Sequence, residues 1–262
     1  MIKLSACAEM LYTNDEFEER IRKLKNDNIN TIEFWQWSNK NLESIKKAAV
    51  KNEMTVCAFC VDSNNQDIQS MVSQTALNKK AEKMLITAVC ESIEKAKYLN
   101  AKNLIITVGN RIDDLTYQQQ MANVIDNLKL IKGYFESEDI TLLIEPINLK
   151  ERPKYLIPDA NALIPVIKEV SSKNIKLLYD IYHQSMENKF DISEFKKALP
   201  YIGHIHIADC PGRHEPGTGN IDFDEIFDVL NKEAYSGYVG LEFQCQRSEA
   251  GILKEIIEKA SK

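Results

Sequence analysis

Short apolar segments alternate with longer amphipathic segments along the whole sequence, and this alternation limits the fold more than any other feature. Eight short segments have the β-branched, apolar character of buried strands, at 3–8, 31–35, 55–61, 103–108, 141–145, 176–180, 204–208 and 238–243. A helical pattern follows each one, at 14–26, 41–51, 76–99, 117–137, 159–170, 191–198, 222–232 and 248–260. Eight such units predict an α/β fold, the (β/α)8 TIM barrel, with its functional site at the carboxyl ends of the strands. An open doubly wound sheet is the alternative.

Composition narrows the kind of partner. The chain has 262 residues, 44% of them hydrophobic, which suits one barrel domain over 1–262. Its net charge is -6 and its basic residues are spread along the chain, so we expect a small-molecule substrate and no nucleic-acid or membrane partner. The first residues show no signal-peptide pattern and no segment is long enough to span a bilayer, which favours a cytoplasmic location.

The six cysteines are expected to be reduced, because a chain of this size builds its core without disulfides. Cys57 and Cys60 form a CxxC pair inside an apolar strand segment, where core packing is favoured over redox chemistry or zinc binding. No glycine-rich phosphate loop follows a strand, so a nucleotide cofactor is not expected.

Four side chains of metal-binding type lie at the ends of the last four predicted strands. They are separated by 35, 26 and 36 residues, and each interval has room for one helix and its loops: Glu145, Asp180, His206 and Glu242. Parallel strands would bring them to one rim of the barrel. Each alone has an ordinary alternative, a helix cap or ion pair for a carboxylate and a hydrogen-bonded core position for the histidine. Together they predict a site for one divalent ion, Mn²⁺ or Mg²⁺ first, with Co²⁺ or Zn²⁺ also suited.

Such a site suits proton transfer on a hydroxy-carbonyl compound. A divalent ion that binds a carbonyl oxygen makes the neighbouring C–H more acidic and stabilises the enediolate that forms. Glu145 and Glu242 are the predicted acid/base pair. Return of the proton to the opposite face of the same carbon gives epimerisation, whereas delivery to the adjacent carbon gives isomerisation, and the residues alone leave both open.

Further polar residues are predicted in loops of the same rim. Glu151, His183 and Arg213 would hold substrate hydroxyls or a carboxylate, with surface solvation as the competing interpretation. The loop at 211–219 is rich in glycine and proline and follows the seventh strand, so it is expected to contact substrate. His204 lies on the same strand face as His206 but deeper.

Residues of the second strand segment complete the predicted rim. Glu33 ends that strand, and Trp35 and Trp37 would either form a wall of the pocket or pack in the barrel.

The same residues carry a family resemblance. The segments IEPIN (144–148), YDIYH (179–183), GHIHIADCPGRHEPGTG (203–219) and GLEF (240–243) resemble the hydroxypyruvate isomerase family, within the xylose isomerase-like group of sugar isomerases and epimerases. The resemblance implies a divalent ion on the four residues named above, with the two glutamates as acid/base pair. Hydroxypyruvate isomerases usually have glutamine where this chain has His206, whereas ketose 3-epimerases of the tagatose and psicose type have histidine there. The epimerases also resemble this chain at Glu151, His183 and Arg213.

The sequence thus favours a metal-dependent isomerase of hydroxypyruvate or a similar short hydroxy-carbonyl acid. A substrate carboxylate would need a cation, which Arg213 with Lys150 or Arg152 would supply. The alternatives are a ketose 3-epimerase, a keto-inositol dehydratase, an endonuclease of the abasic-site type and a sugar-binding module without catalysis. Four histidines and the acidic balance speak against the endonuclease. Proteins of this group often pair, so a homodimer or homotetramer stays open.

Overall fold

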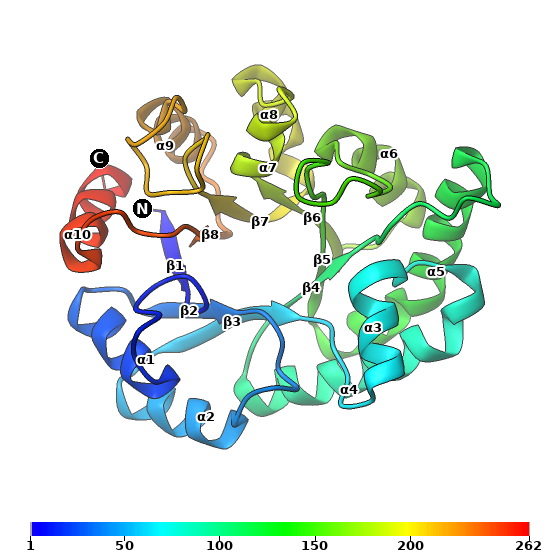
Figure 1. The fold of residues 1–262 in the computed structure, drawn as a ribbon, viewed down its shortest axis with the longest axis horizontal. Coiled ribbons are helices and arrows are strands. Elements are labelled where there is room, and N and C mark those ends of the chain that lie inside the picture. Colours follow the sequence, from blue (N-terminus) through cyan, green and yellow to red (C-terminus); the bar gives the residue numbers. More distant parts are fainter. Residues whose placement is uncertain (1, 262) are drawn as a thin grey trace.

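The computed structural model describes residues 2–261, and its parallel strands close into a barrel in chain order. Figure 1 shows the strands in the centre with the helices around them. The strands are β1 (Lys3–Cys7), β2 (Thr31–Phe34), β3 (Thr55–Cys60), β4 (Asn103–Thr107), β5 (Thr141–Glu145), β6 (Ile175–Asp180), β7 (Ile202–Ile207) and β8 (Tyr238–Leu241). All eight predicted strands are confirmed, with boundaries that differ by at most two residues. The TIM barrel prediction is therefore correct.

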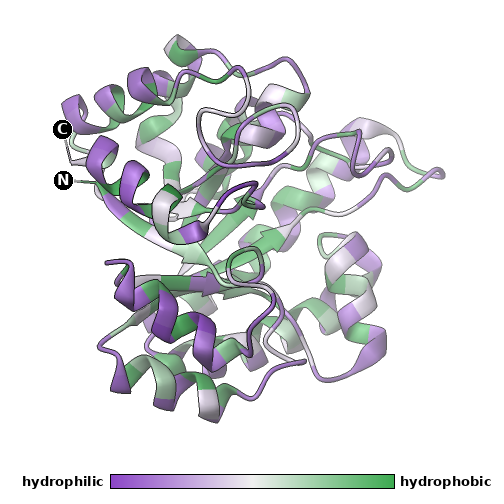
Figure 2. Cartoon of the chain, turned by 60° about the vertical axis from the view of Figure 1, so that its left-hand side comes forward, coloured by the Kyte–Doolittle hydropathy of each residue, from purple (hydrophilic) through white to green (hydrophobic). Residues whose placement is uncertain are grey.

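The helices connect successive strands and cover the barrel from outside. They are α1 (Phe17–Asn26), α2 (Leu42–Lys51), α3 (Gln66–Thr75), α4 (Glu82–Leu99), α5 (Tyr117–Glu138), α6 (Ala160–Val170), α7 (Ile181–Met186), α8 (Ile192–Ala198), α9 (Phe223–Lys232) and α10 (Glu249–Ala260). Two 3₁₀ turns are added, η1 (Lys79–Ala81) and η2 (Leu199–Tyr201). In Figure 2 the strands are mostly hydrophobic and the outer helix faces hydrophilic.

The helix α9 shows how an outer helix attaches to the barrel through one apolar stripe. In α9 the buried side chains are Phe223, Ile226, Phe227 and Leu230, at the three- and four-residue spacing of one helix face. Burial of each such side chain contributes roughly 1.5–3 kcal/mol relative to exposure. The stripe therefore sets which face of the helix meets the strands.

One predicted helix differs in extent, and two helices were not predicted. The segment 76–99, predicted as one helix, contains η1 and α4, and the preceding α3 was not predicted. Asn65 starts α3 by accepting hydrogen bonds from the backbone N–H groups of Asp67 and Ile68, and Asn78 caps η1 in the same way. The apolar stripe of α3 is short, with Met71 and Val72 buried, which is why periodicity did not reveal it. The short α7 was also not predicted.

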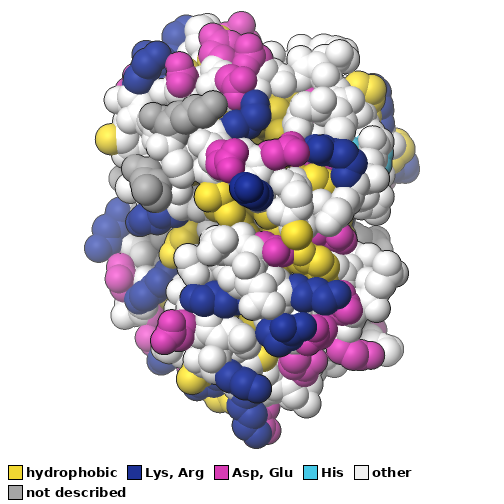
Figure 3. Space-filling view, turned by 90° about the vertical axis from the view of Figure 1, so that its left-hand side faces the viewer, with side chains coloured by type: hydrophobic (Ala, Val, Ile, Leu, Met, Phe, Trp, Pro, Cys, Tyr) yellow, Lys and Arg dark blue, Asp and Glu magenta, His cyan; other side chains and the backbone are white. Residues whose placement is uncertain are grey.

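The surface agrees with the dispersed charge of the sequence. The face in Figure 3 shows basic and acidic side chains interspersed. None of the helices within 2–261 is long and apolar enough to cross a membrane. All six cysteines are unpaired, in line with the expected reduced thiols.

Candidate active site

The last four strands carry the predicted ligands to one rim. Glu145 and Asp180 are the final residues of β5 and β6, and His206 is next to last in β7. Asp180 and His206 are direct neighbours across the β6–β7 pair. Glu242 lies just beyond β8 rather than inside it as predicted, and its backbone N–H donates to the carbonyl of Ile207 at 3.2 Å. The register between neighbouring strands thus places the four side chains at a similar level along the barrel axis.

One ligand atom from each of these four residues lies within 4.8 Å of the other three. We call Glu145, Asp180, His206 and Glu242 the rim cluster. His206 Nδ1 lies 3.4 Å from Glu145 Oε1 and 3.3 Å from Glu242 Oε2. The structure therefore brings the predicted residues together, at a spacing that one ion could bridge.

The donor set fits a divalent cation. Three carboxylates and an imidazole are hard to borderline ligands. Both ring nitrogens of His206 are buried without a well-directed hydrogen bond: Nδ1 faces two of the carboxylates of the rim cluster, and Nε2 faces Glu33. A buried nitrogen without such a bond costs free energy, and coordination to a cation would satisfy it. Mn²⁺, Mg²⁺, Co²⁺ and Zn²⁺ all accept this set of donors.

Arg213 is the cation closest to the rim cluster. Its Nη2 donates to Glu242 Oε2 at 2.6 Å and lies 3.9 Å from Asp180 Oδ2, while Nη1 donates to Glu151 Oε2 at 3.2 Å. Asp209 orders the loop that carries Arg213, because its carboxylate accepts backbone N–H groups of Cys210, Gly217 and Ile221. Of the segment 211–219, only Arg213 lines the cavity described below.

Burial and charge shift the pKa values of the rim cluster in opposite directions. Burial disfavours the carboxylate form of Glu242, but the charges of His206 and Arg213 outweigh it and lower its pKa far below the ordinary value. Burial raises the pKa of Asp180, with a further increase from Glu242. Burial lowers the pKa of His206, but Glu242 and Glu33 raise it well above the ordinary value. In the absence of a metal, the histidine is therefore an imidazolium among carboxylates.

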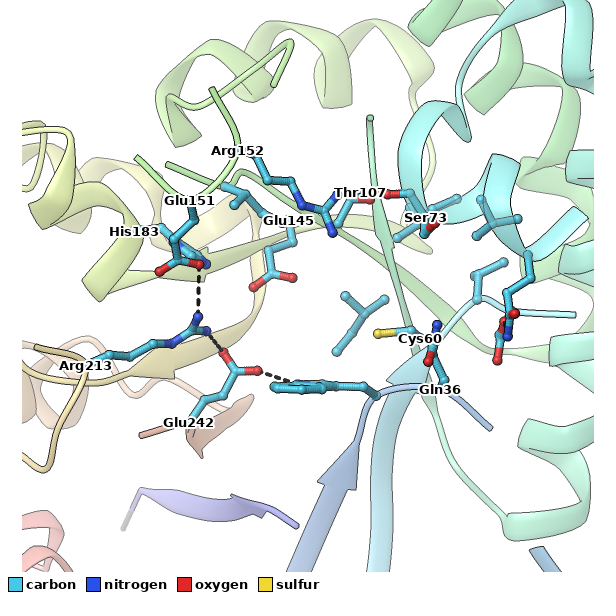
Figure 4. A pocket seen from close by; sticks show the side chains of 18 residues that line it. Gln36, Cys60, Ser73, Thr107, Glu145, Glu151, Arg152, His183, Arg213 and Glu242 are labelled. Carbon is cyan, nitrogen blue, oxygen red and sulfur yellow. Dashed lines mark hydrogen bonds and ion pairs between the residues drawn. The ribbon is translucent and has the colours of Figure 1, made fainter. Parts of the chain in front are cut away.

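A cavity of about 410 Å³ opens above the rim cluster. Figure 4 shows Glu145 and Glu242 facing each other across it. The predicted Glu151, His183 and Arg213 all line it. His183 Nδ1 lies 2.6 Å from Asn148 Nδ2, and its Nε2 lies 3.5 Å from Asp180 Oδ2. The roles of these residues in substrate binding remain predictions.

Only one of the two tryptophans and one of the two candidate cations, Arg152 and Lys150, line the cavity. Trp35 lines the cavity and donates its indole N–H to Glu242 Oε1 at 2.7 Å, whereas Trp37 is buried and donates to Ser92 Oγ at 3.0 Å. Arg152 lines the cavity and donates to the carbonyl of Ser73 at 2.8 Å. Lys150 is exposed and does not line it.

Sequence reasoning did not anticipate two features of the site. Glu33 lies between His204 and His206 and touches both, although it was recognised only as the end of a strand. The wall opposite the rim cluster includes Gln69 and Ser73 of α3, a helix that was not predicted. Glu33 has one signal in the sequence, a charged residue within the apolar TIEF segment.

Comparison with known proteins agrees with this geometry. Residues 9–261 match the family described as xylose isomerase-like TIM barrel. The chain belongs to this family. It is 30% identical to hydroxypyruvate isomerase of Escherichia coli (strain K12), over 96% of this chain and 97% of that protein. It is 28% identical to 2-oxo-tetronate isomerase of Cupriavidus necator, over 58% of this chain and 59% of that protein. The predicted resemblance and the isomerase class are thereby confirmed.

Two solved structures share the fold. A crystal structure described as an AP endonuclease, family 2, from Brucella melitensis superposes with a TM-score of 0.89, covering 98% of this chain and 99% of that chain at 23% identity. D-Psicose 3-epimerase of Clostridium cellulolyticum H10 superposes with a TM-score of 0.74, covering 98% of this chain and 91% of that chain at 18% identity. At such identities the likeness concerns the barrel alone.

Proposed function

We propose that this xylose isomerase-like protein is a metal-dependent isomerase of hydroxypyruvate or a similar short hydroxy-keto acid. The observation that carries the proposal is the rim cluster, whose four ligand atoms lie within 4.8 Å of one another and whose Glu145 and Glu242 line the cavity. The relative named hydroxypyruvate isomerase, matched along nearly the whole chain, supports the substrate class. A bound divalent ion would polarise the substrate carbonyl and make the adjacent C–H more acidic.

The two glutamates have unequal surroundings, which assigns them different roles. Both oxygens of Glu242 are engaged, Oε1 by Trp35 and Oε2 by Arg213. Within the described residues no hydrogen bond reaches Glu145 Oε2, so this oxygen is free to face substrate. Glu145 is therefore the better base for the first proton removal. It takes a proton from the hydroxymethyl carbon of hydroxypyruvate.

The proton must then reach the neighbouring carbon. Glu145, which now carries this proton, can return it to the former carbonyl carbon, while the ionised Glu242 on the other side of the cavity accepts the hydroxyl proton of the first carbon and passes it to the former carbonyl oxygen. The product is the 2-hydroxy-3-oxo acid, an isomer of the substrate with no net gain or loss of atoms. Arg213 keeps Glu242 ionised and oriented for this step.

The substrate carboxylate needs a cation that is still available. The guanidinium of Arg213 is occupied by Glu242 and Glu151, but Arg152 donates only to the carbonyl of Ser73 among the described residues. Arg152 is therefore the stronger candidate to bind the carboxylate, with Arg213 beside it. Lys150 is too exposed for this role.

A second candidate function is ketose 3-epimerisation. It is favoured by His206, because epimerases of the tagatose and psicose type have histidine at this position, and by the size of the cavity. A volume of about 410 Å³ lies within the range of about 300–1,000 Å³ that is typical of ligand pockets and is larger than a three-carbon acid needs. Glu151 and His183 would then hold the additional hydroxyls.

The test is a comparison of substrates with the purified protein and Mn²⁺ or Mg²⁺. Hydroxypyruvate, 2-oxo-tetronate, fructose, tagatose and short ketoses are incubated separately, and the products are resolved by chromatography and mass. We expect turnover of one or both keto acids. Turnover of free ketoses alone would overturn the proposal in favour of the epimerase, and a product lighter by one water would indicate a dehydratase.

A further inference from the structure

The carboxylate of Glu33 bridges two histidines beneath the rim cluster. Glu33 Oε2 lies 2.8 Å from His204 Nε2, and Oε1 lies 3.0 Å from His206 Nε2. The three side chains are buried. Ser5 Oγ donates to the same Oε2 at 3.0 Å. The two imidazole rings meet edge to face, with centroids 5.0 Å apart.

The neighbouring strand leaves space for this arrangement. Gly240 of β8 is the register partner of His206. A Cβ at this position would lie 2.2 Å from Glu33 Oε1 and 2.7 Å from His206 Cδ2. Any larger residue would therefore push the carboxylate away from the imidazole.

The two nitrogens of His206 face different partners. Nε2 faces Glu33, while Nδ1 faces Glu145 and Glu242. A carboxylate that accepts a hydrogen bond from one nitrogen of a neutral imidazole leaves the lone pair on the other nitrogen. Carboxylate–histidine pairs of this kind orient the ring of a metal ligand and increase its basicity.

We infer that Glu33 is a positioning residue for the metal centre: it accepts the Nε2–H of His206 and so directs the Nδ1 lone pair into the rim cluster. The inference rests on the proposed metal site. Glu33 lies on the far side of the imidazole from the cluster, so it acts through His206 and does not touch substrate.

The first test measures Mn²⁺ affinity rather than activity. Chelator-treated protein is titrated with Mn²⁺, and free Mn²⁺ is followed by electron paramagnetic resonance. We expect one ion per chain and a Kd about 10–100-fold weaker in Glu33→Gln. Ser5→Ala is the matched control, because it removes a hydrogen bond to the same carboxylate without touching His206, and its Kd should be unchanged.

The dependence on His206 is tested in a double mutant. In a His206→Gln background, Glu33→Gln should no longer weaken Mn²⁺ binding, because the group it supports is gone. An equal penalty in both backgrounds would overturn the inference, as would an unchanged Kd in Glu33→Gln alone. Two Mn²⁺ ions per chain would also overturn the inference, because Glu33, His204 and His206 have ligand atoms within 4.8 Å of one another and would then be ligands in their own right. Absence of Mn²⁺ binding in the unmodified protein would refute the proposed metal site, a result distinct from these.

A second measurement decides the matter if Glu33→Gln does not fold. Nitrogen-15 spectra of the Mg²⁺-loaded, unmodified protein report which nitrogen of His206 carries hydrogen. The expected tautomer has hydrogen on Nε2. Hydrogen on Nδ1 would exclude the proposed role of Glu33.

Discussion

The two halves of the barrel share one architecture but differ in chemistry. The four residues of the rim cluster lie at or next to the carboxyl ends of β5 to β8. The first half contributes mainly uncharged side chains to the cavity, among them Trp35, Cys60, Ile105 and Thr107, together with the carboxylate of Asp62. Thr107 and Glu145 are direct neighbours across the β4–β5 pair, so the change from wall to ligand occurs between adjacent strands. The second half thus provides the candidate metal ligands, and the first half provides mainly the wall of the cavity.

Glu33 is a buried carboxylate of the first half, and it supports the same division. It belongs to β2 but lies beneath the rim and contacts the histidines of β7. Burial opposes its charge, but His204 and His206 lower its pKa well below the ordinary value. The buried charge of Glu33 therefore serves a residue of the second half.

Of the tests of this difference between the two halves, metal removal should cause the largest loss of activity. Chelator-treated protein should lose about 10³-fold or more in kcat/KM on hydroxypyruvate, because several kcal/mol of charge stabilisation disappear. Mn²⁺ or Mg²⁺ should restore the activity. The ion should also raise the free energy of unfolding, by about 2.7 kcal/mol at 100 times its Kd. Full activity without metal would contradict the assignment of a metal-dependent role to the second half.

Substitution at adjacent strand ends tests the boundary between the halves. Glu145→Gln should lower kcat about 10²- to 10⁴-fold at saturating Mn²⁺, because the base is lost. Thr107→Val, at the neighbouring position of β4, should change kcat less than tenfold, since Thr107 forms wall only. Similar losses in both variants would contradict the division, and steady-state kinetics distinguish the two results.

The pH dependence of metal binding should reveal the protonated His206. The pKa of His206 is raised well above its ordinary value, so an ion must displace the proton of His206 at neutral pH. The Kd for Mn²⁺ should therefore weaken about tenfold for each pH unit below the pKa of His206. In the metal-free protein, the effect of pH on folding stability has the opposite direction. Its His206 contribution to stability is fully present below about pH 6.5, the unfolded pKa, and is lost as pH rises through the folded pKa.

Titration calorimetry in buffers of different ionisation enthalpy would count the released proton. A metal affinity independent of pH between about 6 and 8 would place the proton elsewhere. Thermal melts of the metal-free protein over the same range provide the companion measurement.

The smallest expected effect concerns the two tryptophans. Trp35→Phe removes the N–H that donates to Glu242 Oε1 at 2.7 Å, and a hydrogen bond to a charged group contributes about 1.5–3 kcal/mol, so kcat/KM should fall about tenfold or more. Trp37→Phe is the matched control, because its N–H bonds to Ser92 in the core. It should lower Tm and leave kcat/KM unchanged. The reverse pattern would mean that Trp35 is not part of the site.

The sequence predicted the barrel and the candidate ligands because both depend on local patterns. Apolar runs and helical periodicity mark each βα unit, and the end of a strand is visible from where its apolar run stops. The helix α3 escaped because its apolar stripe is short. Lys150 and Trp37 were weighed for the pocket on proximity in the chain alone, and side-chain direction placed both elsewhere.

By itself, then, the sequence determined the eight-unit barrel, the rim on which chemistry takes place and the residues that reach it. The tertiary structure decided which of those residues face one another: Arg213 on Glu242, Trp35 on Glu242, and Glu33 between two histidines. Trp35 and Glu242 are 207 residues apart, and Glu33 and His206 lie on strands from opposite halves of the chain. Periodicity reports the environment of each segment, whereas such contacts arise only when barrel closure sets the register of every strand against the others.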